Sequence, residues 1–194
     1  ANANRMLAIV TFDGGYRTNL SWGNVAGGAG KNSYDQALAT INGLGMKQGT
    51  NMEGGLYQAL GLLDDTDVDG ISSKNVVMLS DGAPTSRINN SSISASKTNC
   101  DAAANQATAI KNTGAKLYTV CFGAAKDSAY SGGPTVSAFL SDSVASSGCA
   151  YDADSSAELA AAFKSITEQI NSGLSGDGWT TTDPMTDYVG VASG

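Results

Sequence analysis

An alternation of short apolar runs with longer segments of helical periodicity constrains the fold more than any other feature. Three apolar runs, Met6–Phe12, Val76–Leu79 and Lys116–Phe122, are each followed within three residues by glycine. Runs of this length and composition predict strands that are buried on both faces. Between them, segments such as Met52–Leu63 place leucines at intervals of three and four, which is typical of a helix. Strands that alternate with helices predict an α/β domain with a mostly parallel sheet.

Two further segments complete the predicted fold. Tyr16–Trp22 alternates and follows a Gly-Gly turn, so we expect it to form an antiparallel edge strand with Met6–Phe12. Ser155 with Glu158 forms a capping box before the amphipathic helix that runs to Ile170. The whole pattern predicts a Rossmann-like, doubly wound sheet with helices on both faces and one antiparallel edge strand.

Composition narrows the class of protein. The 194 residues suffice for one well-buried domain, and the net charge of −7 comes with few lysines and arginines. Nucleic acid is therefore an unsuitable partner, because its binding needs clustered basic residues. No apolar run approaches the roughly 20 residues that cross a membrane. The abundant small polar residues suit a secreted or surface-displayed protein.

Histidine is absent, which excludes serine–histidine and cysteine–histidine catalysis and imidazole-ligated metal. The three cysteines, Cys100, Cys121 and Cys149, show no CxxC spacing. One disulfide with one free thiol and three buried reduced thiols are both compatible with the sequence.

Two oxygen-bearing residues stand where doubly wound sheets bind ligands, at the carboxyl ends of strands. Asp81 directly follows the strand at Val76–Leu79 and Ser80, and Thr50 precedes the helix at Met52. Without histidine or cysteine beside them, they form a hard oxygen site suited to Mg²⁺, Ca²⁺ or Mn²⁺. The alternatives are that Asp81 caps a turn and that Thr50 caps the helix. Asn51 can also cap this helix, leaving Thr50 for the cation.

Several motifs occur together in the order of a known family. Residues Gly49–Leu56 (GTNMEGGL) and Val76–Pro84 (VVMLSDGAP) resemble the second and third signatures of the metal-ion-dependent adhesion site of a von Willebrand factor A domain. Three other segments fall in the family's order: Ile9–Phe12, Leu117–Gly123 and Tyr151–Asp154. The resemblance covers residues 1 to about 171, and it implies metal ligation by Thr50 and Asp81, with Mg²⁺ the foremost cation.

The family's first signature, Asp-x-Ser-x-Ser at the end of the first central strand, does not occur in this chain. Ala1–Asn4 resembles the tail of the helix that follows that strand. We therefore expect a chain that begins one strand and one helix late, with about 25–40 upstream residues encoding both. The alternative is a strand supplied by another polypeptide.

The C-terminal segment indicates which group of A domains the chain resembles. Trp179–Val189 resembles the segment that follows A domains in cell-wall and pilus-tip adhesins of Gram-positive bacteria. We assign residues 1–171 to the A-like domain and 172–194 to a linker and the first strand of a stalk-type domain.

The resemblance implies a cell-surface adhesion or protein-binding module, extracellular or on a pilus, rather than an enzyme. Its expected partner is a host or cell-surface protein or glycan, bound through the divalent cation. Two alternatives are a metal-dependent phosphotransferase and a purely structural A domain in a pilus or cell-wall assembly. The phosphotransferase is disfavoured because the only lysine close to Thr50 is Lys47 and none follows Asp81 before Lys97.

Overall fold

The structure of the chain is a computed structural model that describes residues 5–45 and 47–174. Most of the predicted stalk-type segment, and the residues Ala1–Asn4 predicted to end a helix, lie outside this part. No helix in the described ranges is long and apolar enough to span a membrane.

The described strands form two separate sheets. One is an antiparallel pair, and the other is a parallel sheet in the order β3-β4-β5. The members of the pair are β1 (Met6–Phe12) and β2 (Tyr16–Asn24), and those of the parallel sheet are β3 (Asn75–Ser80), β4 (Lys116–Phe122) and β5 (Ala150–Ala153). The predicted hairpin and the predicted parallel strands are thereby confirmed.

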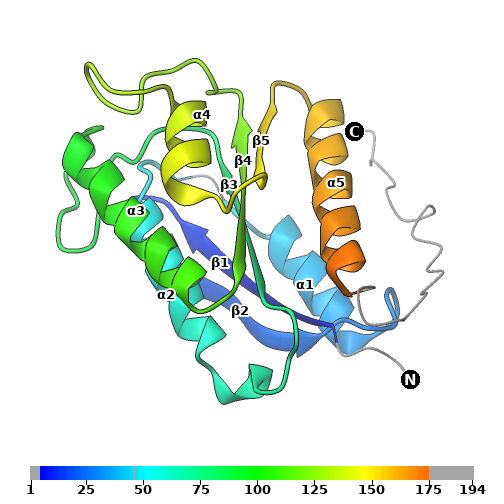
Figure 1. Ribbon diagram of the computed structural model, residues 1–194. Helices are drawn as coiled ribbons and strands as arrows, with labels where there is room; N and C mark the ends of the chain where they lie inside the picture. The colour runs from blue at the N-terminus through cyan, green and yellow to red at the C-terminus, as the bar shows by residue number, and fades with distance from the viewer. Residues whose placement is uncertain (1–4, 46, 175–194) are drawn as a thin grey trace.

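Helices lie on both sides of the parallel sheet. Figure 1 shows α2, α3 and α4 on one side and α5 on the other, with α1 beside the β1–β2 pair. Their bounds are α1 (Asn32–Asn42), α2 (Met52–Leu63), α3 (Lys97–Asn112), α4 (Val136–Phe139) and α5 (Ser156–Leu174), with a 3₁₀ helix at Thr66–Val68 and a π-helical segment at Leu140–Val144. The fold is thus a mixed α/β fold, as predicted.

The core consists of two clusters on opposite faces of β4. Leu117 and Cys121 pack towards α2 and α3, whereas Tyr118 and Val120 pack towards α5 and its Ile166. All four strand side chains are at most 1% exposed. This alternation explains why β4 is apolar from Leu117 to Phe122 except at Thr119, since a strand covered on both faces has no polar side.

The capping box predicted for the last helix is present. The Ser155 hydroxyl accepts a hydrogen bond from the Glu158 N–H at 3.2 Å, and the Glu158 carboxylate accepts one from the Asp154 N–H at 2.7 Å. The carboxylate thus reaches one residue further back than in the usual box.

The doubly wound, Rossmann-like sheet predicted from the sequence is not confirmed, because the described strands form two sheets. β1 pairs only with β2, and β3 pairs only with β4. A cavity of about 490 Å³ separates the two strands, with Val10 on one wall and Val77 on the other. Val77 lies in a run predicted to be buried on both faces, yet it is 39% exposed because no described strand covers this side of β3.

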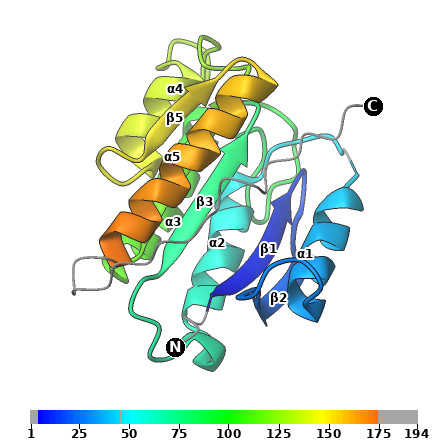
Figure 2. The ribbon, with the colours of Figure 1, turned by 90° about the vertical axis from the view of Figure 1, so that its right-hand side faces the viewer.

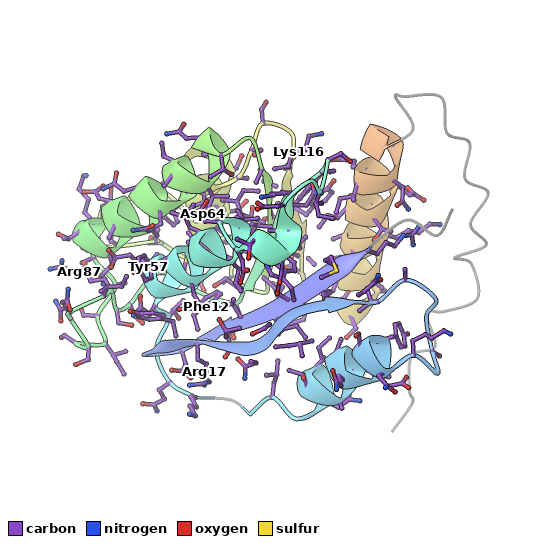
Figure 3. The ribbon with its side chains drawn as sticks, turned by 90° about the horizontal axis from the view of Figure 1, so that it is seen from below. Phe12, Arg17, Tyr57, Asp64, Arg87 and Lys116 are labelled. Atoms are coloured by element: carbon purple, nitrogen blue, oxygen red, sulfur yellow. The ribbon has the colours of Figure 1, made fainter. Side chains whose placement is uncertain are left out.

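The β1–β2 hairpin is held to the rest of the domain through α2 (Figure 3). The Trp22 indole N–H donates to the Leu62 carbonyl oxygen at 2.8 Å. Tyr16 and Tyr57 meet edge to face with ring centroids 6.3 Å apart. Gly55 of α2 lies against the Phe12 ring, where a Cβ would be 2.7 Å from Cδ1 and 3.0 Å from Cγ.

This close approach predicts opposite effects of one substitution at two glycines of α2. Gly55→Ala should lower the free energy of unfolding by about 1–3 kcal/mol, because the added methyl overlaps the Phe12 ring. Gly61→Ala meets open space and should raise it by about 0.5–1 kcal/mol, because alanine favours the helix. Urea denaturation measures both. Equal stabilisation at the two positions would show that Phe12 does not pack tightly on α2.

Candidate functional site

Thr50 and Asp81, the two predicted metal ligands, line the same cavity between β1 and β3. Asp81 follows the last residue of β3, and Thr50 lies two residues before the start of α2. The two residues are 31 positions apart in the sequence. The structure therefore places both predicted residues in the lining of one cavity. Lys47 lines the same cavity.

The backbone of Thr50 is fixed to the loop that follows β3. Its N–H donates to the Thr85 hydroxyl at 2.8 Å, and its carbonyl oxygen accepts from the N–H groups of Thr85 and Ser86 at 3.0 and 3.3 Å. Within the described part of the chain, no hydrogen bond engages the Thr50 hydroxyl. The backbone is thus anchored while the side-chain oxygen is available to a ligand.

Asn51, rather than Thr50, caps α2. Its side-chain oxygen accepts a hydrogen bond from the Gly54 N–H at 2.8 Å, and the residue is 2% exposed. The interpretation of Thr50 as the helix cap is therefore wrong. Asn51 accepts a hydrogen bond from a backbone N–H that has no partner within the helix, as the alternative prediction of an Asn51 cap expects.

Ser80, rather than Asp81, stabilises the turn after β3. The Ser80 hydroxyl donates to the Gly82 carbonyl oxygen at 3.1 Å and accepts from the Gly82 N–H at 3.4 Å. The Asp81 side chain is exposed and makes no hydrogen bond or ion pair within the described residues. Its carboxylate is therefore not used for turn capping, and it is free to bind a cation or a basic group.

A second loop contact, which the sequence analysis does not predict, positions Thr50. The Asn51 N–H donates to the Asp13 carbonyl oxygen at 2.7 Å, and the Gly14 N–H donates to the Gln48 carbonyl oxygen at 2.8 Å. Gly49 has φ +92°, and a Cβ there would lie 2.8 Å from the Gly14 Cα. Only glycine allows this backbone conformation together with so close an approach.

The Asp13 carboxylate stabilises the β1–β2 turn. It accepts from the Gly15 N–H at 2.7 Å and from the Arg17 guanidinium at 2.6 Å, and its side chain is 15% exposed. The Gly15 N–H, and then Arg17, hold the pKa of Asp13 below its usual value. The Asp-Gly-Gly turn with arginine four residues after the aspartate was the available signal for this arrangement in the sequence.

The oxygen ligands that line the cavity are of the type that a hard divalent cation binds, but they are too few to complete its coordination shell. Thr50 supplies a hydroxyl and Asp81 a carboxylate, which are oxygen ligands that Mg²⁺ accepts. Octahedral Mg²⁺ needs about six oxygens, so several must be water or must come from elsewhere. The described residues contain no group of three or more acidic, cysteine or histidine side chains that could hold a metal.

The three cysteines lie buried and unpaired. Of the two redox states that the sequence allows, this arrangement corresponds to three reduced thiols. Burial raises the pKa of Cys100 and of Cys121 to about 11, so both thiols are protonated near neutral pH. Protonated buried thiols are poor nucleophiles and poor metal ligands, and these two serve as core residues.

Comparison with known proteins finds relatives in structure only. No family model and no curated protein matches the chain. Two structures of the pilus adhesin SpaC from Lactobacillus rhamnosus GG superpose with TM-scores of 0.63, for the open conformation, and 0.65. The identities are 19% and 20%, and each match covers 85% of this chain and 25% of the adhesin.

Proximal thread matrix protein 1 from the mussel byssus superposes with a TM-score of 0.58 at 13% identity. That match covers 85% of this chain and 35% of the byssus protein. At these identities the comparisons show a shared fold. The chain spans only a quarter to about a third of the length of these proteins.

The lowered pKa of Asp13 predicts how stability depends on pH. Its carboxylate stabilises the fold fully above about pH 4, the ordinary aspartate value, and this is lost as the pH falls through the lower folded-state pKa. Asp13→Asn should therefore lower the free energy of unfolding by about 1–2 kcal/mol at neutral pH, with the difference shrinking as the pH falls through the lowered folded-state pKa of Asp13.

The matched control for this prediction is Asp101→Asn, which breaks an exposed pair with Lys97 on α3. This variant should change the free energy of unfolding little at neutral or at acidic pH, because exposed ion pairs contribute roughly 0–1 kcal/mol. Denaturant titrations at several pH values measure both variants. An Asp13→Asn effect that is the same at all pH values would mean that the carboxylate charge has no part in the turn.

Proposed function

We propose that this chain is an adhesion module of the von Willebrand factor A type, with its two sheets as halves of one doubly wound, Rossmann-like sheet. The observation that carries the proposal is that Thr50 and Asp81 line one cavity with their side-chain oxygens free. The order of strands and helices and the likeness to a Lactobacillus pilus adhesin support it. The protein then acts on the cell surface or on a pilus.

In this proposal a divalent cation, foremost Mg²⁺, is held by Thr50 and Asp81, while Ca²⁺ and Mn²⁺ are alternatives. The cation supplies positive charge on which a carboxylate or other oxygen ligand of the partner binds. Thr50 can hold its place because its backbone is anchored on both sides, by Thr85 and, through Asn51, by Asp13. The partner is a host or cell-surface protein or a glycan.

The test is binding to cells or to arrays of surface proteins and glycans, with Mg²⁺ and then with a chelator. Chelation should lower binding, and Asp81→Asn or Thr50→Val should each lower it by at least about tenfold, because each removes one of two protein ligands. Asp64→Asn is the control, since Asp64 is an exposed carboxylate after the last residue of α2, away from Thr50. Binding that survives chelation and both substitutions would contradict the cation site.

The few protein ligands predict weak cation binding by the chain without a partner. Calorimetry with Mg²⁺ should give no stoichiometric heat at micromolar protein, because Thr50 and Asp81 leave most of the coordination shell to water. Tight one-to-one binding would mean that further ligands exist and that the two named residues are not the main site.

One observation favours a second candidate, a metal-dependent phosphotransferase. Lys47 lines the cavity together with Thr50 and Asp81, and such enzymes combine a nucleophilic aspartate with a lysine. A phosphatase assay with Mg²⁺ separates the two. Turnover that depends on the metal and is lost in Asp81→Asn would favour the enzyme over the adhesin.

A further inference from the structure

Arg87 lies in the loop between β3 and α3, and two helices fix this loop. On one side, the Ile88 N–H donates to the Glu53 carboxylate of α2 at 2.6 Å. On the other, the buried side-chain amide of Asn99 in α3 donates to the Ser94 carbonyl oxygen at 2.9 Å. Arg87 is therefore held in place before a partner binds, which lowers the entropic cost of binding.

The Arg87 guanidinium has no acceptor within the described part of the chain. Its Nε atom is buried without a hydrogen-bond partner, whereas Arg17 pairs with Asp13. The Glu53 carboxylate accepts from the backbone of the residue after Arg87 and forms no ion pair with the guanidinium. The chain has 18 acidic and 11 basic residues, so a shortage of carboxylates does not explain this. A buried donor without an acceptor is rare, and a guanidinium matches a carboxylate.

An exposed aromatic ring lies near this loop. Tyr57 follows Glu53 by four residues, so both side chains lie on one face of α2. Tyr57 is 52% exposed, and edge-to-face packing on Tyr16 holds its ring. In Figure 2 the arrows of β1 and β3 point to the same end of the domain, so the turn before Tyr16 and the loop after β3 lie at that end. Figure 3 shows Tyr57 and Arg87 at this end.

The same loop connects Arg87 to the candidate cation site. The Thr50 N–H donates to the Thr85 hydroxyl at 2.8 Å, and the Ser86 N–H donates to the Thr50 carbonyl oxygen at 3.3 Å. Arg87 is the next residue along the chain. A partner bound at the cation can therefore reach Arg87 and Tyr57 with a neighbouring group.

The side chains at this end favour a sugar over a peptide. Asn89, Asn90 and Ser91 are exposed in the loop, and amides and hydroxyls pair well with sugar hydroxyls. The tyrosine ring offers a flat apolar surface with a polar tip, on which the C–H face of a sugar ring can stack. A peptide would need an apolar pocket for an anchoring side chain, and neither Arg87 nor Tyr57 lines the cavity between β1 and β3.

We propose that Arg87 and Tyr57 bind one acidic sugar of an oligosaccharide, with the guanidinium on the sugar carboxylate and the tyrosine ring against the sugar ring. The inference rests on the adhesive function proposed above and narrows its partner to a glycan that carries carboxylates. A neighbouring sugar of the same glycan binds the cation at Thr50 and Asp81. Arg87 thereby selects acidic glycans over neutral ones.

The test is an array of sialylated and uronic-acid oligosaccharides in Mg²⁺, each printed beside its carboxyl methyl ester and beside peptides rich in aspartate and glutamate. The ester keeps the sugar rings and removes the charge. The chain should bind at least one free acid about tenfold or more tightly than its ester, because the charged acceptor makes the stronger hydrogen bonds with the guanidinium.

Two variants assign this preference to the two side chains. Arg87→Gln should lower binding of the acid to the level of the ester and leave binding of the ester unchanged. Tyr57→Ala should lower binding of acid and ester alike, and Tyr57→Phe should keep both because it keeps the ring. Lys164→Gln is the control for net charge, since Lys164 is exposed on α5, on the other side of the parallel sheet. Circular dichroism of each variant checks folding.

Chelation separates this inference from the cation site. Suppose that removing Mg²⁺ or Asp81→Asn abolishes binding, while Arg87→Gln keeps the preference for the free acid. The cation site then stands and the acidic-sugar site is wrong. If chelation has no effect and Arg87→Gln still removes the preference, the acidic-sugar site stands without the cation. Equal binding of every acid and its ester, or tighter binding of the acidic peptides than of every acidic glycan, would overturn the proposal.

Discussion

The arrangement of this domain depends on the packing of α2 against the β1–β2 hairpin. In the described chain β1 shares no strand pairing with the parallel sheet, so backbone hydrogen bonds between strands cannot hold the hairpin in place. Two buried glycines of α2 let the helix approach the Phe12 and Tyr16 rings closely, and Trp22 ties β2 to the last turn of α2. A side chain at either glycine would push the hairpin away and widen the cavity between β1 and β3. The position of one half of the fold thus depends on side-chain packing on one helix, together with the backbone hydrogen bonds between the β1–β2 turn and the loop before α2.

The same helix sets the position of the candidate site. The first turn of α2 is capped by Asn51, whose N–H is bonded to the turn after β1, and Thr50 is bonded to the loop after β3. The amino end of α2 therefore connects the carboxyl ends of β1 and β3. A shift of the hairpin would move Asp13 and, through Asn51, would move Thr50 relative to Asp81. The geometry of the site and the width of the cavity are consequently two aspects of one packing arrangement.

Local patterns in the sequence predict most elements but not their assembly. The β4 run and the capping box at Ser155 are local signals, and the structure contains both. The separation into two sheets depends on pairing between distant segments, which periodicity does not encode. Val77 therefore lies in a run that the sequence predicts to be buried, and yet it is 39% exposed. The bond of Thr50 to Thr85 and the contact of Gly49 with Gly14 are equally non-local. That Thr50 and Asp81 line one cavity follows from strand polarity, whereas their role as ligands remains a prediction.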